Sequence, residues 1–371
     1  MFTFEEIYNA YLRCRKGKRN THNALEFELN LIENICNLET LLNKKTYTPK
    51  SSVCFLTTSP KLREVFAADF SDRVIHHLIV PVLEQIYEPK FIYDSYSCRV
   101  NKGIHNATKR ALKFSKASKY YLQLDIKNFF YSIDKNILFQ MTNRTIVQNY
   151  TKVKDTSITL NEMLWIVHKI IFHDVTIDAK LKGDAKSFEL IPPHKTLFKV
   201  VKNKGLPIGN LTSQFFANVY MNDFDNYCKR VLKCKKYIRY VDDFVIFENT
   251  KEKLLEIQRD IERYLYDNLR LHLRENIFLK PVNAGLDFLG YIIRPHYVLV
   301  RKRVVHNFKY KKAKYLQSYE EQKGKMSLAQ IKKFLSVQDS FVGHISHANS
   351  YNLQRKVGVL DEKNPFDYDR F

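Results

Sequence analysis

The 371-residue chain lacks the cysteine and histidine patterns that mark disulfide-rich and zinc-binding proteins. Its six cysteines are scattered, without a Cys-x-x-Cys pair or a matching histidine cluster. The twelve histidines show no ligand spacing, and the neighbouring His76 and His77 fit a helix better than a metal site. The sequence therefore predicts reduced thiols and no zinc site.

Long apolar runs are also missing, as are a signal-peptide pattern, internal repeats and low-complexity tracts. A membrane-spanning helix needs about 20 consecutive apolar residues. We therefore expect no membrane insertion and a soluble protein of the cytoplasm. The length is sufficient for two or three subdomains that share a core.

Acidic residues are few relative to basic ones: 39 Asp and Glu stand against 61 Lys and Arg, giving a formal net charge of +22. A charge of this size attracts polyanions, although a merely soluble basic surface or an acidic membrane would also fit. The excess is concentrated in residues 301–315, where seven cations alternate with two tyrosines. A helix there can follow a phosphate backbone while its aromatic faces contact sugar or base.

Two adjacent carboxylates, Asp242 and Asp243, lie between two apolar arms, residues 237–239 and 244–247. This pattern predicts a β-hairpin with acid at its turn. Like charges on a half-buried turn repel each other, and a divalent cation is the natural compensation. Taken alone, the string Tyr-Val-Asp-Asp is more typical of a solvated turn.

A third carboxylate, Asp125, ends an alternating apolar and polar stretch, residues 121–125, that predicts a strand. One Asp at a strand end and two on a facing hairpin can supply the oxygen ligands for two Mg²⁺ ions about 3.5–4 Å apart. By itself, Asp125 is more typical of a turn or a helix N-cap beside a buried strand.

Residues 205–210 form a Gly/Pro turn that is predicted to open into a helix. Backbone N–H groups at the helix start and the missing side chain of Gly209 suit close approach of a template base or a triphosphate. An ordinary core helix would explain the aromatics but not the small and polar residues before them. The apolar positions with helical spacing are Leu211, Phe215, Phe216, Val219, Phe224 and Val231.

In this order, the segments resemble the motifs of reverse transcriptases. Asp125 falls in the first palm motif, Pro207 to Gln214 in the second, and Asp242-Asp243 in the YxDD box. The other matches are three fingers segments, the next palm motif and the primer grip: residues 61–65, 72–75, 97–103, 269–273 and 288–291. The resemblance covers about residues 55–300. It implies an α+β right-hand polymerase fold with fingers, a palm with an antiparallel sheet, and a helical thumb.

The resemblance also implies individual roles. Asp125 and Asp242 would hold two Mg²⁺ ions, with Mn²⁺ able to substitute, Asp243 would assist, and Ile126 completes the metal set. Phe130 matches the aromatic under the sugar, whose ring would exclude a 2′-hydroxyl. The remaining candidates are Lys61, Arg63, Arg73, Ile208, Gly209 and Gln214 for the dNTP, Phe288, Leu289 and Gly290 for the primer, and Arg99, Arg301, Arg303, Lys311 and Lys312 for nucleic acid. Each fingers cation alone equally fits an ordinary surface charge.

The second palm motif departs from the common pattern, because Ile208 stands where a Gln is usual and Gln214 where a Pro is usual. This variant, together with segments 192–198 and 294–297, resembles reverse transcriptases of diversity-generating retroelements and related unclassified or antiphage-defence lineages. One branch implies error-prone copying of a template RNA with a small accessory protein. The other implies cDNA synthesis from a dedicated non-coding RNA. We favour the first, with a DNA or RNA primer.

The general acid stays open. Relatives often place a Lys, thought to help protonate the pyrophosphate, where this chain has Glu275 and Asn276, and Lys280 lies a few residues on. Two other classes also remain. An inactive nucleic-acid scaffold need not keep three metal carboxylates. An RNA-templated RNA polymerase would favour a small or polar residue where Phe130 stands.

These anchors predict a linear organisation. A helical extension over residues 1–50 precedes fingers over 51–115, a palm over 116–295 and a basic helical thumb over 296–371. A polar, Lys-rich insertion near 150–205 interrupts the palm. The extension carries two apolar stripes, Phe4, Ile7, Tyr8 and Tyr11, and Leu25, Leu29, Ile32, Ile35 and Leu38.

Overall fold

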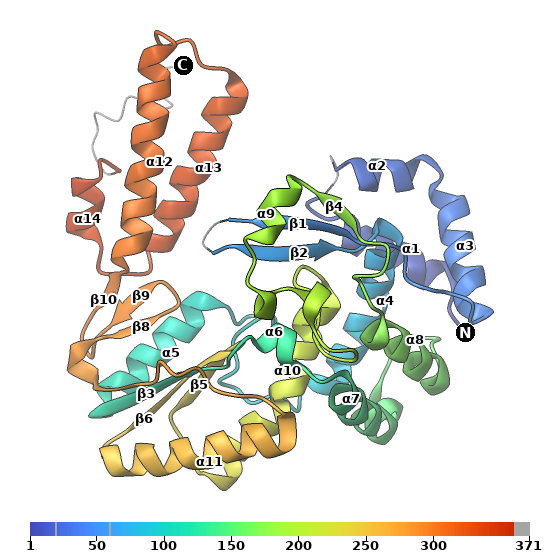
Figure 1. Cartoon of the computed structure of the whole chain (residues 1–371), viewed down its shortest axis with the longest axis horizontal. Coiled ribbons are helices and arrows are strands. Elements are labelled where there is room, and N and C mark those ends of the chain that lie inside the picture. Colours follow the sequence, from blue (N-terminus) through green and yellow to red (C-terminus); the bar gives the residue numbers. More distant parts are fainter. Residues whose placement is uncertain (19–20, 59–60, 360–371) are drawn as a thin grey trace.

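The computed structural model describes residues 1–18, 21–58 and 61–359, and its central element is an antiparallel sheet in the order β5-β6-β3-β7 (Figure 1). The strands are β3 (Tyr120–Asp125), β5 (Tyr237–Tyr240), β6 (Asp243–Glu248) and β7 (Phe278–Pro281). β5 and β6 form the hairpin that the sequence predicts around the two acidic residues. This sheet is the palm.

The uninterrupted apolar run of β6 is explained by burial of both sheet faces. Phe244 and Ile246 lie in the core shared with α10 (Leu211–Asn226) and α11 (Lys251–Leu269). Val245 and Phe247 lie in a second core with α5 (Ile104–Lys116), which belongs to the fingers by sequence but packs on the palm. A π-helical turn, η4 (Tyr227–Val231), follows α10 and leaves Val231 63% exposed, so this residue does not extend the apolar face.

The fingers are built on a second sheet, in which β1 pairs antiparallel with β2 and parallel with β4. Helix α4 follows β2, and the side chain of its N-cap Asp69 accepts a hydrogen bond from the Ser71 N–H. Helix α1 packs against α4. The elements are α1 (Phe4–Arg15), α2 (His22–Leu29), α3 (Leu31–Asn43), β1 (Val53–Thr57), β2 (Arg63–Ala67) and α4 (Phe70–Tyr87).

The second stripe of the N-terminal extension is buried only in part. Ile35 and Leu38 are buried, but Leu25, Leu29 and Ile32 are 50, 82 and 60% exposed. The reason is a break between α2 and α3 at residue 30, which rotates the two halves of the expected helix relative to each other.

The insertion near residues 150–205 contains regular elements, and one of them joins the fingers sheet. Its strand β4 extends the fingers sheet through parallel pairing with β1. Helix α7, just before it, packs on α8. The elements are α6 (Phe129–Ser132), α7 (Lys135–Asn149), η1 (Tyr150–Lys152), α8 (Leu160–Phe172), β4 (Lys180–Lys182), α9 (Ala185–Glu189), η2 (Pro193–Lys195) and η3 (Leu197–Lys199).

The thumb rises from a small sheet in the order β10-β9-β8, which lies between the palm sheet and α12 (Figure 1). Its core includes stacked rings of Phe308 and Phe341, with centroids 3.9 Å apart. No helix in the described part of the chain is both long and apolar enough to cross a membrane. The elements are η5 (Val282–Ala284), β8 (Leu286–Phe288), β9 (Tyr291–Ile293), β10 (Val298–Val300), α12 (Lys302–Glu321), α13 (Leu328–Ile345) and α14 (Tyr351–Lys356).

Candidate active site

Sheet register brings the three predicted carboxylates together at one end of the palm. Asp125, the last residue of β3, lies directly opposite Asp243, the first residue of β6. The Ile126 N–H donates a hydrogen bond of 3.3 Å to the carbonyl of Asp242. Strand end and hairpin turn are thus joined by the backbone.

Burial destabilises the charged forms of all three carboxylates, and neighbouring carboxylates add to this effect at Asp125 and Asp243. Burial, reinforced by the charge of Asp242, raises the pKa of Asp125 to about 6. Burial also raises the pKa of Asp242. Burial raises the pKa of Asp243 to about 7, with the charges of Asp125 and Asp242 adding to it, although a hydrogen bond from Gln123 opposes the shift. Such a cluster is stabilised by a cation.

The donor set fits divalent metal. The Oδ1 atom of Asp125 is buried without a hydrogen-bond partner, so it has a free coordination position. Among the described residues, no three His, Cys, Asp or Glu side chains form a ready-made metal cluster. Mg²⁺ does not need one, because it typically takes one or two carboxylates and completes its shell with water and substrate phosphates.

Two partners of the carboxylates have no counterpart in the sequence motifs. Arg274 Nη1 lies 3.0 Å from Asp125 Oδ2, and the backbone N–H of Arg274 donates a hydrogen bond to the Asp125 carbonyl at 2.8 Å. Gln123 Nε2 donates to Asp243 Oδ1 at 3.2 Å and to the Asp287 carbonyl at 3.1 Å. Alternation along β3 indicates only that Gln123 faces opposite to Leu122 and Leu124, not what it contacts. Lys280, considered as a candidate acid, instead lies over the Phe278 ring at 5.0 Å.

A fully buried ion pair contacts the backbone of the hairpin turn. Arg239 and Asp225 are both 0% exposed, and the guanidinium donates to the two carboxylate oxygens at 2.8 and 2.7 Å. Its Nη1 also donates to the Val241 carbonyl at 2.9 Å, and Nη2 to Ser95 Oγ at 3.2 Å. Val241 has φ +58°, a left-handed conformation that costs a β-branched residue about 1–3 kcal/mol. Arg239 thus fixes the residue before Asp242.

Two of the three predicted fingers cations act electrostatically on the carboxylates. Against the dominant effect of burial, Lys61 lowers the pKa of Asp125 and Arg63 lowers that of Asp242. Both cations are exposed at the start of β2. Arg73 lies elsewhere, with its guanidinium carbon 5.6 Å from the Phe70 ring and its charge acting on Cys14 of α1. The structure therefore does not bring Arg73 to the carboxylates.

The second palm motif is attached to the fingers by its backbone. The Phe66 N–H of β2 donates to the Ile208 carbonyl at 2.8 Å. Gly209 has φ +120°, and a Cβ there would lie 2.8 Å from the Phe66 carbonyl oxygen. The sequence predicts close approach of a template base or a triphosphate at this glycine. In the structure the backbone of β2 approaches it closely and leaves no room for a side chain.

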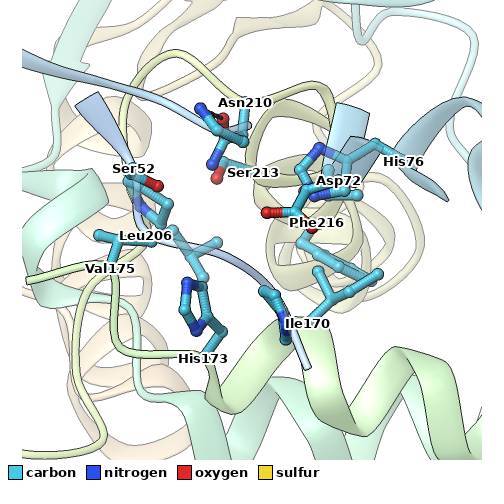
Figure 2. Close-up of a pocket in the computed structure, with 14 residues that line it drawn as sticks. Ser52, Asp72, His76, Ile170, His173, Val175, Leu206, Asn210, Ser213 and Phe216 are labelled. Carbon is cyan, nitrogen blue, oxygen red and sulfur yellow. Dashed lines mark hydrogen bonds between the residues drawn. The ribbon is translucent and has the colours of Figure 1, made fainter. Parts of the chain in front are cut away.

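A cavity of about 20 Å³ lies where this motif meets α4, a volume that holds about one water molecule (Figure 2). Asp72, one of its lining residues, accepts hydrogen bonds from the Tyr47 hydroxyl at 2.7 Å and the Lys50 N–H at 2.9 Å. His76 also lines it, and burial lowers its pKa to about 3. The cavity is a polar joint between fingers and palm and is too small for a nucleotide.

The remaining nucleotide candidates lie around the same motif. Phe130 is half-buried against Phe129, and its carbonyl accepts a hydrogen bond from the Leu206 N–H at 2.7 Å. Gln214 is exposed at the start of α10, and its Oε1 accepts a hydrogen bond from Cys98 Sγ at 3.4 Å.

The predicted primer grip is the tight turn between β8 and β9. Leu289 and Gly290 occupy it with φ +54° and +92°, while Phe288 is fully buried in the palm core. The Gly290 carbonyl accepts a hydrogen bond from the Arg301 N–H at 2.9 Å. Leu289 and Gly290 are therefore partly exposed at this turn, whereas Phe288 is not.

The predicted nucleic-acid cations differ in exposure. Arg303 and Lys311 of α12 are exposed. Arg301 forms an ion pair with Asp287 at 2.6 Å, and Lys312 donates to the Val357 carbonyl at 2.8 Å. The Arg99 side chain is only 5% exposed and is held by Glu88 at 2.8 Å and by two main-chain carbonyls. Arg99 thus points into the protein instead of toward solvent, because the fold supplies it with internal acceptors.

The ion pair under the hairpin generates a stability prediction. Arg239→Met should lower the free energy of unfolding by about 3–5 kcal/mol, because it leaves the Asp225 charge buried and unpaired. Urea denaturation measures this. The double variant Asp225→Leu with Arg239→Met should regain much of the loss, since two apolar side chains need no partner.

Arg144→Met is the matched control, because it breaks an ion pair with Asp223 whose side chains are 61 and 41% exposed. Arg144→Met should lower the free energy of unfolding by less than about 1 kcal/mol. Equal losses in the Arg239 and Arg144 variants would contradict the assignment of the buried pair as the anchor.

Comparison with known proteins agrees with this geometry. Residues 48–293 match the family described as reverse transcriptase (RNA-dependent DNA polymerase). The chain is 26% identical over 277 residues to group II intron-encoded protein LtrA of Lactococcus lactis subsp. cremoris, covering 64% of this chain and 45% of that protein. It is 24% identical over 311 residues to protein YkfC of Escherichia coli strain K12, covering 73% of this chain and 72% of that protein.

The chain thus spans less than half the length of LtrA. Among solved structures, apo telomerase from Candida Tropicalis matches with a TM-score of 0.47 and 12% identity, over 75% of this chain and 55% of that one. Reverse transcriptases normally use divalent metals, which agrees with the carboxylate cluster. The family match covers most of the chain and every palm motif described above, and the chain belongs to the reverse transcriptase family.

Proposed function

We propose that this protein is an RNA-directed DNA polymerase that makes cDNA from an RNA template and a DNA or RNA primer. The observation that carries the proposal is the meeting of Asp125, Asp242 and Asp243 at one end of the palm, each with a raised pKa, with Lys61 and Arg63 of the fingers acting electrostatically on the cluster. In the reaction, the primer 3′-hydroxyl loses its proton to water and its oxygen bonds to the α-phosphorus of a dNTP. The bond between that phosphorus and the oxygen bridging to the β-phosphate breaks, and pyrophosphate leaves with the electron pair.

The protein's residues have separate tasks in this proposal. Asp125 and Asp242 would hold two Mg²⁺ ions, with Mn²⁺ able to substitute, and the bound metals supply Lewis-acid stabilisation of the phosphoryl group. The Ile126 backbone and Asp243 flank that pair. Lys61 and Arg63 neutralise the triphosphate, the turn at Leu289 and Gly290 positions the primer, and Arg303 and Lys311 contact the nucleic-acid backbone. Such an enzyme would work in the cytoplasm, where template RNA and dNTPs meet.

Loss of a metal ligand should abolish synthesis without unfolding the protein. Asp125→Asn or Asp242→Asn should lower cDNA synthesis by more than about a hundredfold, because even the outer-shell partners of metal ligands contribute about tenfold to a hundredfold. RNA binding should persist, because the basic surface is unchanged. Labelled dNTP incorporation and RNA gel shifts measure the two properties.

Asp267→Asn, at an exposed position of α11, is the matched control and should retain parental synthesis. Synthesis at the parental rate by either active-site variant would refute the metal assignment.

Phe130 generates a prediction about sugar selection. Phe130→Ala should raise ribonucleotide incorporation, because removal of the ring opens space for a 2′-hydroxyl. Primer extension with rNTPs and dNTPs gives the ratio, and Phe278→Ala, at an exposed phenylalanine of β7, is the control. If the variant rejects rNTPs as strongly as its parent, another side chain forms the gate.

For the biological role, we propose error-prone copying in a diversity-generating retroelement, with a small accessory protein. Similarity to a group II intron-encoded protein supports a retroelement in the wider sense. Ile208 and Gln214, in place of the usual Gln and Pro, support the narrower role. The alternative is antiphage defence with cDNA made from a dedicated non-coding RNA. A template and variable repeat pair near the gene, with a small helical accessory gene, would support the first role.

Fidelity separates these roles biochemically. An aliphatic Ile208 cannot donate the hydrogen bonds of Gln, so about 1–3 kcal/mol of discrimination is lost, roughly tenfold to a hundredfold in error rate. Ile208→Gln should therefore lower misincorporation, most clearly opposite template adenine, in sequenced cDNA. Ile177→Gln, at a 63% exposed position, should leave it unchanged. Equal and low error rates in the parent and Ile208→Gln would favour the defence role.

A further inference from the structure

A basic pocket of about 270 Å³ opens next to Asp125. Its lining includes the cations Lys127, Lys195 and Arg274, together with His194, and one carboxylate, Glu275. Among the described residues, neither Lys127 nor Lys195 forms an ion pair with a carboxylate. The pocket therefore carries a surplus of positive charge available to an anion.

Two of these residues come from the insertion, whose contribution to the site is not apparent from the sequence. His194 and Lys195 lie in the turn η2, closed by a hydrogen bond of 2.8 Å from the Lys195 N–H to the Pro192 carbonyl. The next residues are fixed by Glu64 of β2, which is 1% exposed and accepts a hydrogen bond from the Leu197 N–H. Glu64 and Arg63 are neighbours in β2. The same strand therefore fixes both the insertion and the fingers cation Arg63.

Arg274 connects the pocket to the carboxylates. It lines the pocket and also forms the 3.0 Å ion pair with Asp125. Lys127 also lines this pocket and lies two residues after β3. Its backbone N–H donates a hydrogen bond to the His272 carbonyl at 2.8 Å. The primer-grip hairpin is connected through a different carboxylate, since Gln123 joins Asp243 to the Asp287 carbonyl. The basic pocket and the primer turn thus adjoin different members of the cluster.

We propose that this pocket binds the pyrophosphate that leaves during nucleotidyl transfer, and the assignment rests on the proposed polymerase function. When the primer oxygen bonds to the α-phosphorus, the electron pair of the broken P–O bond passes to the pyrophosphate, which gains negative charge. Lys127, Lys195 and Arg274 neutralise that charge, and His194 and Asn276 offer hydrogen-bond donors. The insertion thus supplies part of the product site.

Direct binding tests the pocket without any need for catalysis. Pyrophosphate is titrated calorimetrically into the metal-free protein, its His194→Gln/Lys195→Gln variant, and Lys199→Gln, whose exposed lysine lies just beyond the pocket in the same insertion. The double variant should bind pyrophosphate about fivefold to tenfold more weakly than the parent, because the positive charge of Lys195 is lost and the His194 imidazole is replaced by an uncharged amide. The control should match the parent. Equal affinity in all three proteins, or no binding to the parent, would overturn the proposal.

Kinetics then distinguish product from substrate binding. Inhibition of cDNA synthesis by pyrophosphate should weaken in the double variant by a larger factor than any rise in KM for dNTP. Equal factors would assign the pocket to the triphosphate of the incoming nucleotide and overturn the product assignment. If the parent makes no cDNA although it binds pyrophosphate at this pocket, the polymerase proposal fails while the anion site stands.

Discussion

The geometry of the candidate site depends on the ion pair between Arg239 and Asp225. Both charges are completely buried, so each would be strongly destabilising without the other. The pair joins α10, the segment at Ser95 and the hairpin turn through one guanidinium. Because Arg239 also satisfies the Val241 carbonyl, it stabilises the left-handed residue that directs Asp242 to the end of the sheet. The buried ion pair therefore fixes the conformation of the hairpin turn, and this conformation places Asp242 beside the other carboxylates.

A second constraint places the fingers relative to the palm. β2 donates to the Ile208 carbonyl, packs its backbone on Gly209, and holds the insertion through Glu64. The same strand begins with Arg63, one of the cations that act electrostatically on the carboxylates. The positions of the fingers cation, the second palm motif and the insertion are consequently not independent. A change in any one of the three contacts would move the others relative to Asp125.

The sequence predicts the palm well because its signals are local. Asp125 ends an alternating strand, and Asp242 and Asp243 interrupt two apolar arms, so periodicity alone indicates where each carboxylate lies. Arg274 and Gln123 could not be found in this way, since their contacts depend on sheet register between segments far apart in the chain. Arg99 shows the converse, because a cation in a recognisable motif is held by internal acceptors that only the fold reveals.

The charge distribution supports the proposal that a cation and a nucleotide bind together at this site. The chain as a whole carries a formal charge of +22 and attracts phosphate, yet the three carboxylates create a local negative centre. Arg274, Lys61 and Arg63 offset that centre only in part, since burial keeps the pKa values of Asp125 and Asp243 near 6 and 7. A bare triphosphate next to them would add further repulsion. A divalent cation bound together with the nucleotide would offset the repulsion among the carboxylates and the repulsion between carboxylates and triphosphate. The arrangement therefore favours a metal–nucleotide complex over either component alone.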